Sequence, residues 1–254
     1  MRVSVVTAVR NCATTLPDAI ESVRMQTHSE IEYIVVDGLS DDGTHEVVES
    51  ASDRVNQSIR EADDGIYSAL NKGLSHATGD IVGFLHADDC LDHPKAIANV
   101  AQAMSSREID AVYGDLLYVD AGETQKVIRY WKSGSYGIGR FRRGWMPPHP
   151  TVYMRREVYD RYGGFREDFG SGADYECLLR MMVRHRIRVS YLPTVMVRMR
   201  LGGASNSSLR GRLAANRSDR RAWLENGLKP PVGLRLTKPL SKLPQYFRRP
   251  PATR

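Results

Sequence analysis

Short strand-like runs alternate with helical patterns over the first 115 residues, and this feature limits the fold more than any other. Residues 3–6, 34–36 and 81–85 are mostly apolar and predict strands. Residues 16–23 and 66–74 carry apolar side chains at helical spacing. Strands separated by helices predict an α/β fold with a mainly parallel central sheet, flanked by helices, whose ligands gather at the carboxyl ends of the strands.

The pattern changes near residue 111. Strand-like stretches follow one another through residues 111–130, and residues 120–123 predict a hairpin turn between the last two. We therefore expect a smaller antiparallel portion beside the parallel sheet. Residues 1–205 are predicted to form one domain with two halves, 1–115 and 116–205, and a chain of this length can bury its own core.

The C-terminal end is much more basic than the rest of the chain. Residues 210–254 contain 12 Lys and Arg and two acidic residues, so this segment carries +10, whereas the other 24 basic and 28 acidic residues give −4. An acidic body argues against nucleic acid as the partner. A basic, Pro-containing extension, residues 206–254, is suited to an anionic surface such as phospholipid headgroups, and a merely solvated tail explains the same composition.

Neither a membrane span nor an export signal is predicted. No stretch approaches the roughly 18 uninterrupted apolar residues that a spanning helix needs. The N-terminus enters a predicted strand without the basic region and apolar segment of a secretory signal. We therefore expect a cytoplasmic protein, with the basic extension as a means of peripheral attachment to the inner face of the cytoplasmic membrane.

Acidic side chains follow two of the predicted strands. Asp37 follows residues 34–36, and Asp88 and Asp89 follow residues 81–85. Because parallel strands end at one edge of a sheet, these acids are expected on one rim. Adjacent carboxylates repel unless a cation or water separates them, and Mg²⁺ and Mn²⁺ bind carboxylate oxygens while keeping positions for phosphates. Ordinary turns explain the same residues, so the neighbouring motifs must decide.

The order of several motifs resembles that of family 2 glycosyltransferases of the GT-A fold. The matching segments are residues 7–11, 37–44, 61–63, 65–73, 77–80, 86–89 and 173–176. Each is weak alone, whereas their order along one chain is specific. The resemblance implies an inverting hexosyltransferase of bacterial polysaccharide or glycolipid biosynthesis, with a nucleotide-sugar donor bound by residues 1–115 and a sugar, lipid-linked glycan or glycolipid acceptor bound by residues 116–205.

The resemblance also implies roles for single residues. Asp37 would bind the base or ribose, Asp88 the ribose, and Asp89 the metal, Mn²⁺ or Mg²⁺, with Asp88 as the alternative ligand. Asp174 would be the general base, with Glu176 as second choice. The other expected donor contacts are Thr7, Arg10, Asn11, Glu61, Asp63, Tyr67, Asn71, Lys72, His86 and His149. For Lys72 and His149, contact with donor phosphate and a purely structural role are both open.

Three departures from the family pattern qualify these roles. His86 stands where the family often has the first acid of an Asp-x-Asp pattern, so we expect it to hydrogen-bond the donor or a neighbour, with coordination of Mn²⁺ as the alternative. Arg10 replaces an aromatic residue that stacks on the base, which leaves the nucleobase open. The acceptor motif of processive members is missing after Asp174, which favours a single transfer.

Two other functions share some of these residues. A sugar-phosphate nucleotidyltransferase has paired acids on an α/β sheet, but residues 9–13 lack its glycine-rich, basic phosphate loop. A non-catalytic nucleotide-sugar-binding module would not need Asp37, Asp89 and Asp174 together. The sequence leaves the donor sugar, the acceptor, the linkage and the oligomeric state open.

Overall fold

The computed structural model describes residues 1–202, 218–233, 243–246 and 250. The strands are β1 (Val3–Val9), β2 (Ile31–Asp37), β3 (Gln57–Arg60), β4 (Ile81–Phe84), β5 (Asp89–Leu91), β6 (Ala111–Val119), β7 (Val127–Trp131), β8 (Tyr153–Arg155) and β9 (Val189–Arg200). The α-helices are α1 (Leu16–Arg24), α2 (Thr44–Ser50), α3 (Ile66–His76), α4 (Ala96–Ala103), α5 (Ile138–Arg142), α6 (Arg156–Tyr162) and α7 (Ala173–Leu178). Short helices of other types are η1 (His149–Thr151), η2 (Glu167–Gly172) and η3 (Leu179–Arg184).

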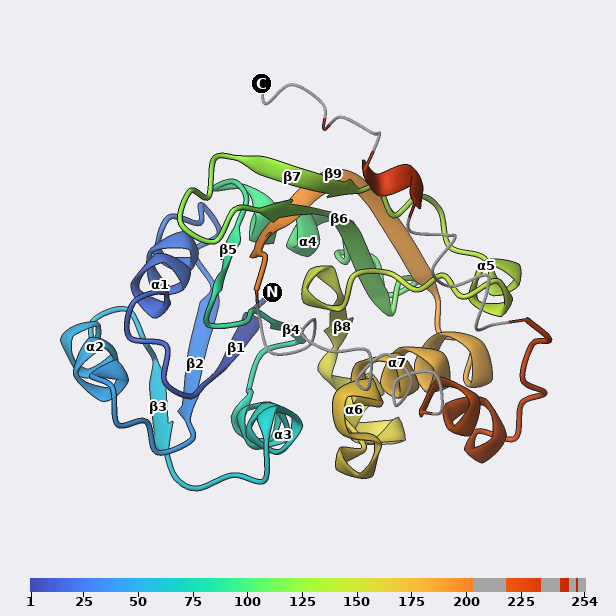
Figure 1. The fold of residues 1–254 in the computed structure, drawn as a ribbon, viewed down its shortest axis with the longest axis horizontal. Coiled ribbons are helices and arrows are strands. Elements are labelled where there is room, and N and C mark those ends of the chain that lie inside the picture. The colour runs from blue at the N-terminus through green and yellow to red at the C-terminus, as the bar shows by residue number, and fades with distance from the viewer. Residues whose placement is uncertain (203–217, 234–242, 247–249, 251–254) are drawn as a thin grey trace.

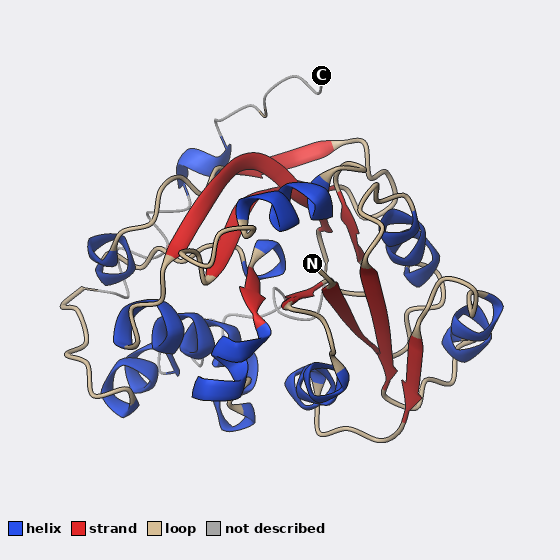
Figure 2. Ribbon diagram, turned by 180° about the vertical axis from the view of Figure 1, so that it is seen from behind, coloured by secondary structure: helices blue, strands red, loops and turns tan. Residues whose placement is uncertain are grey.

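These strands form one sheet with helices on both of its faces, which confirms the predicted α/β fold (Figures 1 and 2). Among the described residues the order is β3-β2-β1-β4-β8-β6-β9-β5, and β7 pairs with β6. β3, β2, β1 and β4 pair in parallel, with Val9 opposite Asp37 and Asp37 opposite Arg60. Their carboxyl ends therefore lie along one edge, as the sequence predicted.

Alternate residues of β1 enter two different hydrophobic cores. Val3 and Val5 pack in a cluster with residues of α1 and α4, and Val6 and Ala8 pack in a cluster with residues of α3. All seven residues of β1 are buried, because both faces of the strand are covered. This explains why β1 and β4 are mostly apolar.

Gly83 brings β4 close to β8. An ideal Cβ at Gly83 would lie 2.2 Å from Cε1 of Tyr153, the residue opposite it. Both residues are buried inside the sheet, so Gly83→Ala is expected to lower the free energy of unfolding by about 1–3 kcal/mol. Denaturant unfolding followed by circular dichroism measures this, with Gly139→Ala as control because no atom lies within 4 Å of a Cβ there. Equal midpoints for both variants would contradict the close packing.

The second half of the chain completes the sheet. The predicted hairpin is confirmed, since β6 and β7 pair antiparallel. β6 also pairs antiparallel with β8 and parallel with β9, and the parallel pairing was not predicted. β9 lies between β6 and β5 in the sheet, and residues near its end pair with β5, which begins at Asp89. The end of β9 therefore lies beside the loop that follows β4.

Part of the predicted C-terminal extension packs on the domain. Residues 218–225 are helical, and Trp223 is 1% exposed in the same hydrophobic cluster as Ala173 and Tyr175. A further short helix, η5 (Leu243–Tyr246), contacts β7. Residues 203–217, 234–242, 247–249 and 251–254, which carry much of the charge predicted to meet a membrane, lie outside the described residues. None of the described helices has the length and apolar character of a transmembrane segment.

Candidate active site at the carboxyl ends of the parallel strands

Asp37 organises the loop after β2. Its side chain is buried, and Oδ1 accepts hydrogen bonds from the backbone N–H of Ser40 at 2.9 Å and from its hydroxyl at 2.5 Å. Oδ2 lies 3.1 Å from Nε of Arg60, at the end of β3. A buried carboxylate is stable when donors and an opposite charge surround it in this way. Asp37 therefore fixes the strand end and the turn beside it.

The loop after β1 is tied to the loop after β2. Asn11 has a positive φ of 54°, a conformation that Asn adopts more easily than most residues. Its backbone N–H donates to Oγ of Ser40, and its Oδ1 accepts from the N–H of Asp41. The N–H of Ala13 donates to Asp42 in the same way. Asn11 and Asp37 thus belong to one rigid pair of loops.

The loop after β3 contributes Asp63 and Glu61. A Cβ at Gly38 would lie 2.2 Å from Oδ2 of Asp63, so only glycine allows Asp63 to cover this turn. Oδ1 of Asp63 accepts from the N–H of Gly65. Lys72 of α3 pairs with Glu61 at 3.0 Å and also donates to the Ala62 carbonyl. The ammonium of Lys72 is therefore directed to this loop, which matches the structural alternative.

The two adjacent acids after β4 have different surroundings. Asp88 is partly exposed, whereas Asp89 is 0% exposed, and both of its carboxyl oxygens lack a hydrogen-bond partner among the described residues. Burial, with a contribution from Asp88, raises the pKa of Asp89 well above its usual value, and Arg200 acts in the opposite sense. An enclosed carboxyl is poorly placed to bind a hydrated cation, whereas the partly exposed carboxyl of Asp88 can reach one. The surroundings therefore favour Asp88 over Asp89 as the metal ligand.

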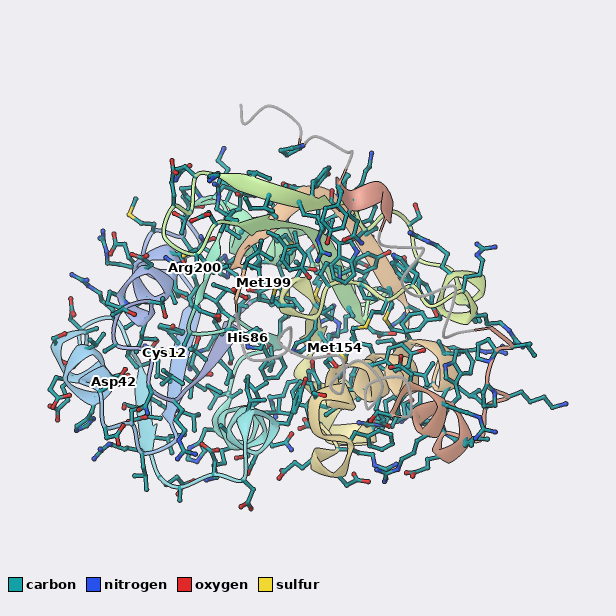
Figure 3. The ribbon with its side chains drawn as sticks, in the orientation of Figure 1. Cys12, Asp42, His86, Met154, Met199 and Arg200 are labelled. Carbon is teal, nitrogen blue, oxygen red and sulfur yellow. The ribbon has the colours of Figure 1, made fainter. Side chains whose placement is uncertain are left out.

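Arg200 holds the same loop from the end of β9 (Figure 3). Its Nη1 donates to the carbonyl oxygen of Asp88 at 2.7 Å, and its Nη2 pairs with Asp18 of α1. The sequence analysis missed Arg200, because it is 112 positions from Asp88 and no motif connects the two. Only the pairing of β9 with β5 brings it there.

His86 and His149 lie next to each other, and His86 interacts with the charge of Asp88. Their ring centroids are 6.0 Å apart, and His149 stacks on Phe84 at 5.7 Å. Burial lowers the pKa of both, that of His149 to about 3, so both imidazoles are neutral near pH 7. Nδ1 of His86 and Nε2 of His149 are buried without a partner among the described residues. These two nitrogens have unused hydrogen-bonding capacity, which suits a polar ligand.

Asp174 is the second residue of α7 and lies close to α3. Its Oδ1 accepts a hydrogen bond from the N–H of Tyr175 at 2.7 Å, and the side chain is partly exposed. The pKa of Tyr67 is raised by burial and further by the charge of Asp174, which places these two side chains together. Asn71 lies one turn further along α3. Its Nδ2 donates to the Phe165 carbonyl, and its Oδ1 accepts from the Phe165 N–H. Asn71 therefore joins α3 to the second half.

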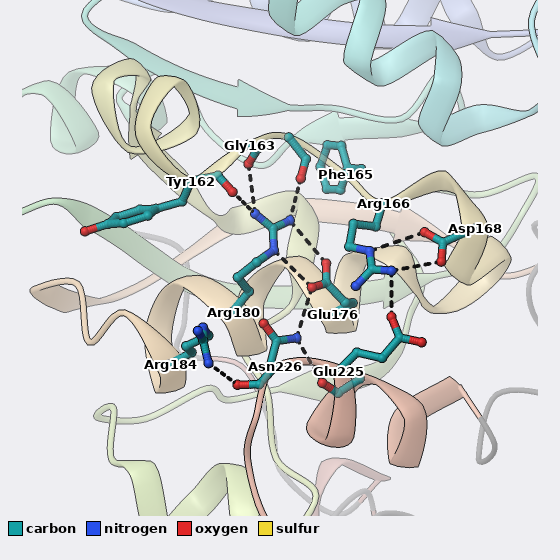
Figure 4. A network of polar contacts seen from close by, with 12 residues as sticks. Tyr162, Gly163, Phe165, Arg166, Asp168, Glu176, Arg180, Arg184, Glu225 and Asn226 are labelled. Carbon is teal, nitrogen blue, oxygen red and sulfur yellow. Dashed lines mark hydrogen bonds and ion pairs between the residues drawn. The ribbon is translucent and has the colours of Figure 1, made fainter.

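Glu176 is excluded as the base by a buried network (Figure 4). It is 0% exposed, and its two oxygens accept from Nε and Nη2 of Arg180 at 3.0 and 3.1 Å. Arg180 also donates to the carbonyls of residues 162–164, and Asn226 donates to Glu176. The predicted pairing of Glu176 with Arg180 is confirmed, and this pairing leaves no oxygen of Glu176 open to a substrate.

Ring contacts and charge interactions connect five of the predicted residues, Asp88, His86, His149, Tyr67 and Asp174. Asp88 is followed by His86 and His149, then by Phe165, which packs against both His149 and Tyr67, and Tyr67 lies beside Asp174. Burial raises the pKa of Cys12, and the charge of Asp88 is the second cause of this rise. Asp88 therefore lies near Cys12, in the loop after β1.

Of the remaining predicted donor contacts, Thr7 lies on β1 and Arg10 directly after it. Thr7 is fully buried and donates to the Leu85 carbonyl, so we assign no donor contact to its side chain. Arg10 is exposed at the end of β1.

Residues 4–163 match the sequence model of glycosyl transferase family 2. A PGL/p-HBAD biosynthesis glycosyltransferase of Mycobacterium bovis is 27% identical over 211 residues, which cover 80% of this chain and 79% of that protein. A glycosyltransferase of Mycobacterium tuberculosis is 30% identical over 186 residues, covering 70% of this chain and 68% of its own.

Solved structures have the same fold. Staphylococcus aureus TarS 1–349 with UDP-GlcNAc has a TM-score of 0.69 and 18% identity. The match covers 91% of this chain and 68% of the TarS chain. The mannosyltransferase PcManGT of Pyrobaculum calidifontis, with GDP-Man and Mn²⁺, has a TM-score of 0.66 and 21% identity. The match covers 97% of this chain and 73% of PcManGT. These likenesses confirm the GT-A fold, and the family match spans well over half of the chain. The protein therefore belongs to glycosyltransferase family 2.

Proposed function

We propose that this glycosyltransferase moves a hexose from a nucleotide-diphosphate sugar to an acceptor hydroxyl with inversion, one sugar per acceptor. The observation that carries the proposal is the connected group that joins Asp88 to Asp174 through His86, His149, Phe165 and Tyr67. This group connects Asp88, which follows the parallel strand β4, with Asp174 in the second half of the chain. Transfer to an acceptor needs one group at the leaving diphosphate and another at the attacking hydroxyl.

Asp174 is suited to activate the acceptor. Its carboxylate is partly exposed at the start of α7, whereas Glu176 is enclosed and ion-paired. A carboxylate about 3 Å from the acceptor hydroxyl removes its proton as the hydroxyl attacks. Attack on the face opposite the leaving diphosphate inverts the anomeric carbon. An α-linked donor sugar would therefore give a β-linked product.

The donor is proposed to lie along the edge formed by the loops after β1, β2, β3 and β4. Asn11, Asp37 and Asp63 fix the first three loops and would surround the nucleoside. His86 and His149 offer unpartnered nitrogens to the diphosphate or sugar. The complexes of TarS with UDP-GlcNAc and PcManGT with GDP-Man support a nucleotide-sugar donor.

Asp88 is proposed to hold a divalent cation with the donor. Among the described residues no three His, Cys, Asp or Glu side chains form a complete metal site, which fits an ion that takes one or two carboxylates and fills its other positions with phosphate and water. Mn²⁺ or Mg²⁺ would neutralise charge on the departing diphosphate. Relatives of this fold bind Mn²⁺ with GDP-Man and Mg²⁺ with UDP.

The acceptor is proposed to be a glycolipid or a lipid-linked glycan. The printed role of the Mycobacterium bovis relative, PGL/p-HBAD biosynthesis, supports a glycolipid acceptor.

The released product tests the proposed reaction. The full chain is incubated with UDP-, GDP- and dTDP-hexoses, Mn²⁺ and extracted glycolipids, and the products are separated by chromatography. We expect a nucleoside diphosphate and a glycosylated lipid with the opposite anomeric configuration. Pyrophosphate would indicate a nucleotidyltransferase. Donor binding without turnover across the panel would indicate a binding module.

A further inference from the structure

The helix that carries Asp174 is short and depends on its neighbours for its position. α7 has six residues and continues directly into η3. Helices shorter than roughly 12–15 residues are barely stable by themselves in water. The position of Asp174, the second residue of α7, is therefore set by what packs around the helix.

Two side chains of the C-terminal segment bind the residues that directly follow Asp174. Nε1 of Trp223 donates to the hydroxyl of Tyr175 at 2.9 Å, and both side chains are buried. Nδ2 of Asn226 donates to Oε1 of Glu176 at 3.0 Å, and Asn226 is 4% exposed. Both bonds lie in the interior, where an unsatisfied partner would cost about 1–3 kcal/mol.

The segment that leads into α7 is held by the helix of residues 218–225. Arg166 pairs with Glu225 at 2.6 Å, and Arg221 pairs with Asp168 (Figure 4 shows the first of these pairs). The guanidinium groups of Arg166 and Arg221 lie 4.7 and 4.3 Å from the ring of Phe169. Residues 218–226 therefore hold the chain both before and after Asp174.

We propose that Trp223 and Asn226 are positioning residues for Asp174. The inference rests on the proposed role of Asp174 as the base. Neither side chain belongs to the connected group at the donor, so their loss should change the approach of Asp174 to the acceptor hydroxyl rather than donor binding. A shift of about 1 Å in a reacting group can cost about 100-fold in rate.

Two variants test this proposal, with a matched control in the same segment. Trp223→Phe removes the N–H and keeps an aromatic ring, and Asn226→Ala removes the bond to Glu176. Leu224→Ala is the control, because Leu224 is 49% exposed. We expect each of the first two to lower kcat about tenfold or more, with the donor KM within about twofold and the thermal midpoint above the assay temperature. The control should keep the wild-type kcat.

A double-mutant cycle separates positioning from general loss of stability. Trp223→Phe and Tyr175→Phe break the same hydrogen bond, so their effects on kcat should not add. Wild-type kcat in folded Trp223→Phe and Asn226→Ala would overturn the proposal. The proposal would also be overturned if the fractional loss of kcat in each variant equalled its unfolded fraction. Asp174→Asn in the same assay tests the base separately: if that variant is active, the proposed base is wrong, whatever the positioning variants do.

Discussion

Asp174→Asn should lower kcat for sugar transfer by about 10²–10⁴-fold while leaving donor binding almost unchanged. The amide keeps the shape of the side chain but cannot remove a proton from the acceptor. Asp174 lies beside Tyr67, and its Oδ1 already accepts from the Tyr175 N–H, so the variant side chain keeps the oxygen that makes this bond. Steady-state kinetics with donor and acceptor varied separately measure kcat, and calorimetry with the unhydrolysed donor measures binding.

The control for this prediction is Asp160→Asn, the same chemical change on α6. The Asp160 side chain is 59% exposed and pairs only with Arg156 among the described residues, so activity should stay at the wild-type level. If Asp174→Asn retains most of its activity, the base lies elsewhere. A loss of donor affinity equal to the loss of kcat would assign Asp174 to donor binding instead.

Asp88→Asn should raise the Mn²⁺ concentration for half-maximal activity at least tenfold and lower the maximal rate by about 100-fold, because a cation at the diphosphate is worth several kcal/mol. Asp89→Asn should leave the Mn²⁺ dependence within about twofold. Asp89 is enclosed, so its carboxyl is not expected to contact a hydrated cation. Titration of Mn²⁺ into EDTA-treated enzyme, read by product formation, compares the two.

The adjacent acids serve as controls for each other, since each variant removes one carboxylate from the same loop. Thermal unfolding of both proteins shows whether either change disrupts β5. A large shift in Mn²⁺ dependence for Asp89→Asn, with none for Asp88→Asn, would restore the ligand that the sequence pattern first suggested.

The sequence predicted the features that depend on local pattern. Asp37 and Asp88 were placed on one rim because apolar runs end just before them and parallel strands end together. The pairing of Glu176 with Arg180 followed from helical spacing. These predictions need only neighbours along the chain or a regular repeat.

What the sequence could not show depends on segments far apart in the chain. Asp89 was predicted as the metal ligand with Asp88 as the alternative, and the burial of Asp89 results from the pairing of a three-residue strand with β9. Trp223 stands in a basic segment that resembles a solvated tail, yet it is buried beside Tyr175. Lys72 was open to phosphate, and its ion pair with Glu61 and its hydrogen bond to the Ala62 carbonyl direct it to a loop.

The path of β9 has a consequence for engineering this enzyme. The strand lies between β6 and β5 and pairs with both, and Arg200 at its end donates to the Asp88 carbonyl. A chimera that exchanges residues 116–205 for those of a relative would thus replace the support of the proposed donor loop along with the proposed acceptor surface. Altered acceptor choice in such a hybrid would come with altered donor handling, unless the graft keeps Arg200 and the residues of β9 that face β5.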